Sequence, residues 1–258
     1  MKSSLIKKMY TITSTLVLVL FVACCNQKSE LIGGFDDNGA SRATFSVGEV
    51  RTVRFSKGNL QRIEGEWLFA EQQYDYFGTV DFNNNYDGDG DLFRWREYRS
   101  DAIKNGGNRI GMWRELTSDE WQYLLLYRKS STIGDMNNAR FAKACVNGVN
   151  GLIIFPDNYS HPKQVAIPKI INNENATFSN VYSKEEWSIM EKSGCVFLPA
   201  AGCRVNEVIV AGRAGIYWAA DVYGSGLLYT LYFGETRLSA SDHDVKKWGH
   251  SVRLVMDN

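Results

Sequence analysis

The chain has 258 residues, of which 44% are hydrophobic and 22% charged, and its 29 basic and 29 acidic side chains give a formal net charge of zero. This composition excludes a disordered chain, a collagen and a coiled coil, and the lack of excess positive charge argues against a nucleic-acid-binding protein. The 23 glycines against 4 prolines, with 13% aromatic residues, favour a β-rich fold with many turns.

The N-terminal segment has the pattern of a bacterial signal peptide. Three lysines precede an apolar run over residues 16–22, which is too short to cross a bilayer as a helix. The run ends in Leu-Phe-Val-Ala-Cys over residues 20–24, which resembles a lipobox with Cys24 as the acylated residue. Cys25 is a second candidate, and a plain secretory signal is the alternative. We predict a signal peptide over residues 1–23 and an exported protein held in the cell envelope by a lipid anchor.

The rest of the chain is predicted to be one tethered domain. Residues 24–43 are predicted as the lipidated N-terminus and a flexible polar tether, and residues 44–258 as a single domain. Cleavage after residue 23 leaves 26 basic and 29 acidic side chains, a net charge near −3. After Cys24 and Cys25 three cysteines remain, so at least one is unpaired. Cys195 and Cys203 either form a disulfide or stay as buried free thiols.

The strands are predicted from apolar alternation. Residues 45–55 predict two strands interrupted at Gly48, and residues 60–69 predict a hairpin around Gly65. Residues 71–110 show little periodicity and predict a long ordered loop region or a functional insertion. Further strands are predicted over residues 151–155, 195–199, 215–220, 227–233 and 251–256.

Two helices are predicted from their capping boxes. In each box a Thr or Ser side chain accepts the amide of the third helical residue, whose glutamate returns to the cap amide. The first box is Thr117 to Glu120, followed by an apolar face that begins at Trp121. The second is Ser183 to Glu186, and Gly194 ends that helix.

An acidic loop is the best sequence candidate for a metal site. Asp87, Asp89 and Asp91 place carboxylates at every second residue, an arrangement in which a tight loop can wrap calcium. An EF-hand register would require a glutamate where Arg96 stands, so the loop is not an EF-hand. Asp and Gly are also common in plain turns, and a metal-free loop is the alternative. No cofactor is required by the sequence, and calcium is the one candidate.

No catalytic motif is present among the common ones. The chain has no HExxH, P-loop, paired CxxC, nucleophile elbow or Rossmann fingerprint. His243, between two aspartates, is interpreted as part of a solvated surface turn, and His250 as making a structural hydrogen bond at a strand entrance. Most tryptophans are interpreted as core residues. Trp95, between Arg94 and Arg96, is predicted to be exposed and is the candidate ligand-binding residue.

Several separated motifs carry a family resemblance. They occupy residues 105–108, 111–121, 146–157, 190–191, 196–202, 215–218 and 249–255. In that order, from Asn-Gly-Gly-Asn to Gly-His-Ser-Val-Arg-Leu-Val, they resemble the Fib-succ-major paralogous-domain family. The similarity runs from Thr44 to the C-terminus.

That family looks like a branch of the C-type-lectin-like fold shared with formylglycine-generating enzymes, whose helix-opening motif is similar to residues 114–121. The resemblance implies an α+β domain with irregular antiparallel sheets, two main helices and long loops, in a lipoprotein of the gram-negative outer membrane. The sequence departs from the family at Arg94-Trp95-Arg96, where a glycine-rich stretch is usual. The family's loop geometry is therefore not assumed there.

Three functions follow as hypotheses. The favoured one is a non-catalytic, envelope-anchored binding or adhesion module for a glycan or an envelope protein. The second is a structural subunit of a cell-surface assembly. The third, an enzyme related to formylglycine-generating enzymes, would need two thiolates near the C-terminal strand to hold copper(I), and no cysteine follows Cys203. The membrane is an expected partner through the lipid anchor, and nucleic acid is not.

Overall fold

The computed structural model describes residues 34–77, 89–100, 102–205 and 208–258. The predicted signal peptide, the lipidation site at Cys24 and the first part of the tether lie outside these ranges, as does Asp87. No helix within the described ranges is long and apolar enough to cross a membrane.

The described residues form a mixed α+β fold in which antiparallel strands dominate. The sheets are β1-β2-β14, β3-β4, β7-β5-β6-β8, β9-β10 and β11-β12-β13, and the β5–β7 pair is parallel. The strands are β1 (Phe45–Ser46), β2 (Thr52–Phe55), β3 (Leu60–Ile63), β4 (Glu66–Phe69), β5 (Phe141–Val146), β6 (Val149–Ile154), β7 (Asn180–Tyr182), β8 (Val196–Pro199), β9 (Cys203–Val205), β10 (Val208–Val210), β11 (Ala214–Gly224), β12 (Leu227–Gly234), β13 (Leu238–Val245) and β14 (Val255–Asp257).

Both predicted helices are confirmed with their capping boxes. Helix α2 (Ser118–Gln122) begins after Thr117, and it continues as one turn of π-helix, η1 (Tyr123–Tyr127). Helix α3 (Lys184–Lys192) begins after Ser183. Gly194 follows α3 with a φ of 95°, the left-handed conformation that ends many helices.

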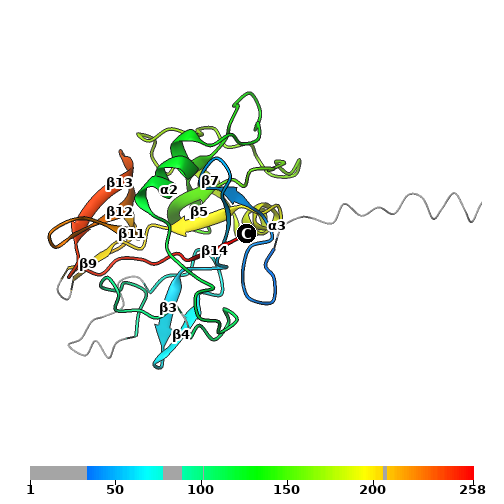
Figure 1. Cartoon of the computed structure of the whole chain (residues 1–258). Helices are drawn as coiled ribbons and strands as arrows, with labels where there is room; N and C mark the ends of the chain where they lie inside the picture. Colours follow the sequence, from blue (N-terminus) through cyan, green and yellow to red (C-terminus); the bar gives the residue numbers. More distant parts are fainter. Residues whose placement is uncertain (1–33, 78–88, 101, 206–207) are drawn as a thin grey trace, which may run out of the picture. The chain divides into compact units, whose positions relative to one another are not determined.

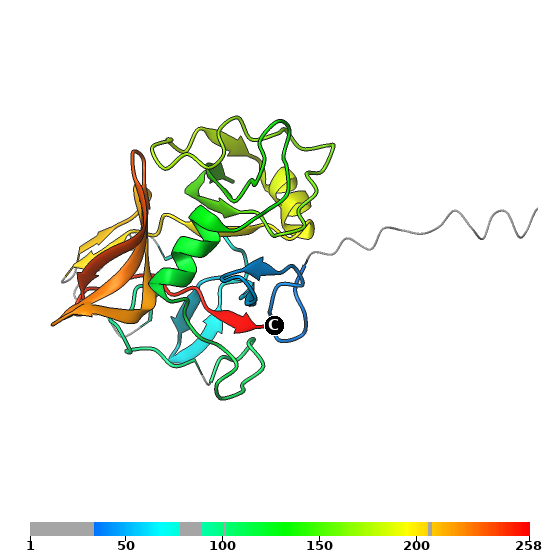
Figure 2. The ribbon, with the colours of Figure 1, turned by 45° about the horizontal axis from the view of Figure 1, so that its top comes forward.

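The four-stranded sheet is buried on both faces. Helix α3 covers one face, where Trp187 packs on Phe197 at a centroid separation of 5.5 Å. The other face meets β1, β2, α2 and the inner side of β11-β12-β13 in the largest apolar cluster, which includes the fully buried Trp121. Figure 2 shows α2 lying against the sheet β11-β12-β13. Because both sides are apolar, β6 and β8 have few polar residues.

The C-terminal segment, residues 249–257, runs through the middle of the domain and joins its sheets. His250 exchanges two backbone hydrogen bonds with Phe93, both 3.0 Å long, and the carbonyl of Val252 accepts from the amide of Leu60 at 2.9 Å. The segment then ends as β14 beside β2, with Val255 opposite Phe55 (Figure 1).

Most predicted strands are confirmed, with two corrections. The predicted strand over residues 251–256 is shorter, because residues 251–254 bond to several different segments and only Val255–Asp257 pairs regularly. The prediction of a surface turn around His243 is wrong, since the residue lies on β13 opposite Tyr229. Strand β5, which pairs with β6 along its length, was not predicted.

The tether prediction is wrong for residues 34–43. Asp36 accepts the amides of Asn38 and Ala40 in a tight turn and also pairs with Arg54 at 2.8 Å. The side chain of Ala40 is fully buried, and its backbone bridges to Ser56. Polar composition suggested a linker, but the aspartate and glycine instead form a turn that packs onto the domain.

We predict that Trp121→Ala lowers the free energy of unfolding by about 3–5 kcal/mol, because it removes a fully buried indole beside Phe55. Urea denaturation followed by circular dichroism measures the change. A loss below about 1 kcal/mol would contradict a close-packed site around this residue.

We predict that Arg253→Met lowers the free energy of unfolding by about 2–3 kcal/mol. The side chain is 1% exposed and donates to Asn59, Gln73 and the carbonyl of Phe197, so its removal leaves buried acceptors short of donors. The matched control is Arg109→Met at an exposed arginine, which should change stability by less than about 0.5 kcal/mol. Equal effects of the two substitutions would show that the buried network contributes nothing.

Candidate binding surface

Three chain segments converge at one end of the sheet β11-β12-β13. The turn between β11 and β12 ends at Gly226, whose carbonyl accepts the amide of Lys246 at 3.2 Å. The carbonyl of Lys246 in turn accepts the amide of Trp95 at 3.4 Å. The hairpin tip, the end of β13 and the segment around Trp95 therefore lie side by side. We call this region the hairpin-tip surface and define it by Arg94, Trp95, Arg96, Tyr223, His243, Lys246 and Lys247. Tyr223 and His243 lie on the face of the sheet that carries Tyr229, whereas Trp95 packs at the opposite face, with Leu228.

An aromatic pair forms one part of the hairpin-tip surface. The ring of Tyr223 stacks on that of His243 with centroids 4.0 Å apart and planes 5° apart. Tyr229 meets Tyr223 edge-on at 5.2 Å and is itself packed against the main core cluster. Tyr223 is nevertheless 49% exposed. The stacked pair thus contacts the core through Tyr229 and presents a flat aromatic face to solvent.

Trp95 is half-buried, which corrects the prediction that it is exposed. Its indole packs at the edge of the cluster that contains Phe93 and Trp218. The guanidinium of Arg96 lies over the indole, 4.1 Å from the ring centroid, which is a favourable cation–π distance. Arg96 has a φ of 61°, a left-handed conformation that is uncommon for a residue other than glycine.

Four exposed cations lie in the segment of Trp95 and at the end of β13. Arg94, Arg96, Lys246 and Lys247 are all solvent-exposed, and none of them forms an ion pair with a residue in the described part of the chain. One neighbouring acid has other partners. Glu97 accepts the amide of Arg94 and lies 3.5 Å from Arg204. The positive charge at this surface is therefore not neutralised by the side chains that the structure describes.

The two described aspartates of the predicted calcium loop have separate backbone partners. The carboxylate of Asp89 accepts the amides of Glu64 and Gly65 and so stabilises the turn between β3 and β4. The carboxylate of Asp91 is buried and accepts the amide of Phe77 at 3.0 Å. Among the described residues no group of three or more acidic, histidine or cysteine side chains is gathered as for a metal. Because Asp87 lies outside these residues, calcium binding remains a prediction.

The described cysteines and His250 do not form an activated nucleophile. Cys145, Cys195 and Cys203 are free thiols, so no disulfide joins the latter two. Burial raises the pKa of Cys203, and the nearby Asp244 raises it further, which disfavours the reactive thiolate. His250 is fully buried against Trp218, with its Nε2 atom 3.1 Å from Oδ2 of Asp244. The burial of this imidazole gives it no access to a substrate.

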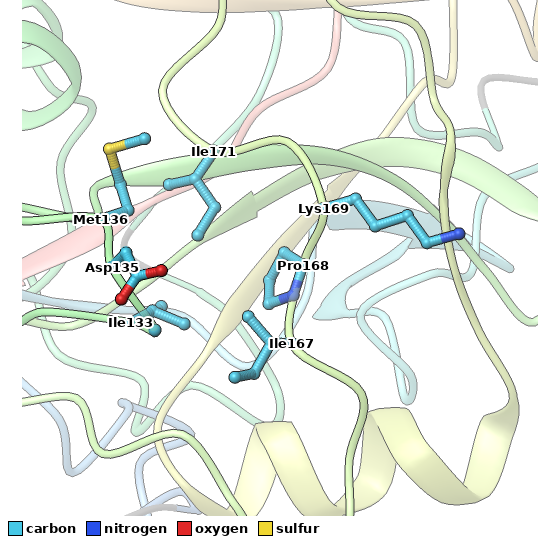
Figure 3. A pocket seen from close by; sticks show the side chains of 8 residues that line it. Ile133, Asp135, Met136, Ile167, Pro168, Lys169 and Ile171 are labelled. Atoms are coloured by element: carbon cyan, nitrogen blue, oxygen red, sulfur yellow. The ribbon is translucent and has the colours of Figure 1, made fainter.

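A separate groove of about 340 Å³ lies between two loops of the domain. Figure 3 shows Ile133, Asp135 and Met136 on one side of it and Ile167, Pro168 and Ile171 on the other. Ile167 is 53% exposed and Met136 43% exposed. The lining is mainly aliphatic and includes no aromatic ring on which a sugar could stack. The groove suits an apolar side chain of a protein better than a glycan.

No known protein-family model, curated protein or solved structure matches this chain. The resemblance to the Fib-succ-major family and the C-type-lectin-like assignment therefore remain predictions. The coarser prediction of an α+β fold with two short α-helices is confirmed by the described residues.

The sequence predicts Trp95 as a site residue but does not predict Tyr223, His243 or the two lysines. The Lys-Lys pair at residues 246–247 and the aromatic residues on both sides of the turn at Ser225 and Gly226 are visible in the sequence. The backbone hydrogen bonds that join these segments to the segment of Trp95 are long-range, and local patterns do not contain them.

We predict that the stability of the protein falls as the pH rises from about 4 to about 7, in part because of Asp91. Burial raises the pKa of this carboxyl to about 7 from an ordinary value near 3.8, so the native state holds its proton where the unfolded state has lost it. Asp91→Asn removes this dependence. The variant should match the wild type at pH 4 and exceed its free energy of unfolding at pH 8 by up to about 4 kcal/mol.

Urea denaturation at several pH values, with a chelator present, measures this difference. The matched control is Asp37→Asn, because Asp37 is an exposed aspartate. A pH profile for Asp91→Asn that runs parallel to the wild type would show that the buried carboxyl has no raised pKa.

Proposed function

We propose that this chain is a non-catalytic, envelope-anchored lipoprotein that binds a glycan through the hairpin-tip surface. The single observation that supports the proposal best is the half-exposed Tyr223, stacked flat on His243 and braced by Tyr229. A pyranose ring has an apolar C–H face that packs on such an aromatic ring, while its hydroxyl groups bond to polar neighbours. The rigid sheet holds the rings in place, so little conformational entropy is lost on binding.

The envelope location is part of the proposal and rests on the sequence. The lysine-rich start, the short apolar run and Cys24 are the features of a lipoprotein leader. Binding at a surface loop cluster of a tethered domain is the expected use of such an anchor. The raised pKa of the Cys203 thiol and the burial of His250 support a non-catalytic role over the enzyme alternative.

A structural subunit of a cell-surface assembly is the second candidate function. The observation that favours it is the aliphatic groove with the exposed Ile167 and Met136, which would be covered in an assembly. Ile167→Asp would then disrupt assembly and leave glycan binding unchanged. The two functions use different surfaces and can be distinguished by this substitution.

We predict that the full chain, kept soluble in a non-ionic detergent, binds defined glycans on an array. Tyr223→Ala should weaken that binding about fivefold to tenfold, because it removes the stacking ring. The control is Tyr127→Ala, since Tyr127 is 67% exposed on η1 and takes no part in the stacked pair. Equal binding by both variants would contradict a role of the aromatic pair.

The same array with calcium and again with a chelator tests the acidic loop. Binding that disappears with the chelator supports a calcium-dependent lectin that uses Asp87, Asp89 and Asp91. Binding that persists contradicts the calcium prediction and leaves the aromatic pair as the basis of recognition. Absence of binding under both conditions would overturn the proposed function.

A further inference from the structure

The N-terminal turn of the domain packs against the loop of residues 104–112. A Cβ placed on Gly107 would lie 2.6 Å from Oδ1 of Asn38, and one placed on Gly39 would lie 2.9 Å from the carbonyl oxygen of Asn105. The two segments are therefore in close contact. This contact places the 104–112 loop beside the first described residues of the chain.

Buried groups fix the base of the 104–112 loop. The side-chain amide of Asn105 donates to the carbonyl of Phe69 at 3.0 Å, and its oxygen accepts the Phe69 amide at 2.7 Å. The buried indole of Trp113 packs edge-on against the ring of Phe69 and donates to the carbonyl of Gly106 at 2.7 Å. A loop with such anchors at its base has little freedom to turn its exposed residues inward.

The outer turn of this loop exposes an apolar side chain and a cation. Ile110 is 88% exposed, although isoleucine is among the residues most often found buried. The neighbouring Arg109 is exposed and forms no ion pair with a residue that the structure describes. Behind them a hollow of about 320 Å³ is lined in part by Met112 and Met256. Apolar side chains next to a cation suit the boundary between the headgroups and the acyl chains of a bilayer.

The predicted lipid anchor keeps this outer turn within reach of a membrane. Gly34 follows Cys24 by ten residues, and ten extended residues span at most about 35 Å. From the N-terminal turn, Asp36 pairs with Arg54, which lies opposite Met256 of the hollow. The point where the tether joins the domain is thus connected to the hollow by direct contacts.

The acids near the outer turn limit how much of the domain can approach a bilayer. Asp36 and Asp257 are each paired with an arginine, at 2.8 and 2.6 Å. Asp37 is exposed in the N-terminal turn, and lipid phosphates would repel its carboxylate. We therefore expect a shallow contact that is made by Ile110 and Arg109 and not by the N-terminal turn.

We propose that the outer turn of the 104–112 loop rests on the bilayer that holds the lipid anchor, with Ile110 among the upper acyl carbons and Arg109 paired with lipid phosphates. This inference rests on the proposed function, which supplies the anchor. Figures 1 and 2 show the sheet β11-β12-β13 on the opposite side of the domain from the C-terminus, next to which Asp257 lines the hollow. The contact thus orients the domain so that the hairpin-tip surface faces away from the membrane.

The experiment adds a tryptophan at the outer turn and measures how strongly brominated lipid quenches its fluorescence. The full chain with Ile110→Trp is placed, through its anchor, in vesicles of phosphatidylethanolamine and phosphatidylglycerol whose acyl chains are either native or brominated. The matched control is Val222→Trp, because Val222 is also an exposed aliphatic residue, 57% exposed on β11. The wild type gives the signal of the seven native tryptophans, which is subtracted. Thermal unfolding confirms that each variant is folded.

The tryptophan added at position 110 should be quenched at least about threefold more than the one added at position 222, because only the outer turn meets the acyl region. Arg109→Gln in the Ile110→Trp chain should reduce this quenching by about half, since it removes the charge that pairs with phosphate. Glycan binding on the array should be the same for Ile110→Trp and the wild type, because the two surfaces are separate.

Flotation of the vesicles separates failure of the inference from failure of the proposed function. Equal quenching at positions 110 and 222, in chains that float with the vesicles, would overturn the inference and leave the proposed function standing. Quenching at position 110 that Arg109→Gln leaves unchanged would overturn the phosphate contact. A wild-type chain that does not float with the vesicles has no anchor, and that result would overturn the envelope location on which both proposals rest.

Discussion

The buried guanidinium of Arg253 is the interaction on which the arrangement of the sheets depends. It donates to Asn59 after β2, to Gln73 after β4 and to the carbonyl of Phe197 in β8. No carboxylate among the described residues forms an ion pair with it, and burial lowers its pKa to about 10. The side-chain amide of Gln73 in turn donates to Oε1 of Glu191 in α3 at 2.9 Å, which connects the network to that helix. Polar protein groups therefore solvate this one buried cation. Its hydrogen bonds connect elements that are far apart in sequence.

The same C-terminal segment also positions the hairpin-tip surface. At the start of this segment, the backbone of Gly249 pairs with that of Arg204. The side chain of Arg204 donates to the carbonyl of Leu92. His250 then pairs with Phe93 and packs on Trp218, so the segment that carries Trp95 is fixed to the sheet β11-β12-β13. The surface is therefore held by rigid structure on two sides, although none of its exposed residues belongs to the core. Changes at Arg253 and at Tyr223 should accordingly separate stability from binding.

The sequence predicted the elements whose determinants are local. The capping boxes at Thr117 and Ser183 need only four consecutive residues, and the β3–β4 hairpin needs only alternation around Gly65. Strand β13 was missed because residues 239–244 are Ser, Ala, Ser, Asp, His and Asp, which favour turns when they are considered alone. Pairing with β12 supplies the hydrogen bonds that override this preference. Propensity therefore failed where a polar segment is stabilised by its neighbour in space.

The residues of the candidate site also divide into those that local patterns predict and those whose role depends on tertiary contacts. Trp95 could be selected from its flanking arginines, but its half-burial depends on Phe93 and the third apolar cluster. Local sequence predicts His243 as a turn residue. In the structure it lies on β13 opposite Tyr229, and its ring stacks on that of Tyr223. Asp91 shows the converse: its spacing predicts a calcium ligand, but its carboxyl is buried and burial raises its pKa. Residue type and spacing indicate which chemistry a side chain can perform, and only tertiary contacts decide whether that chemistry faces a ligand, the backbone or the core.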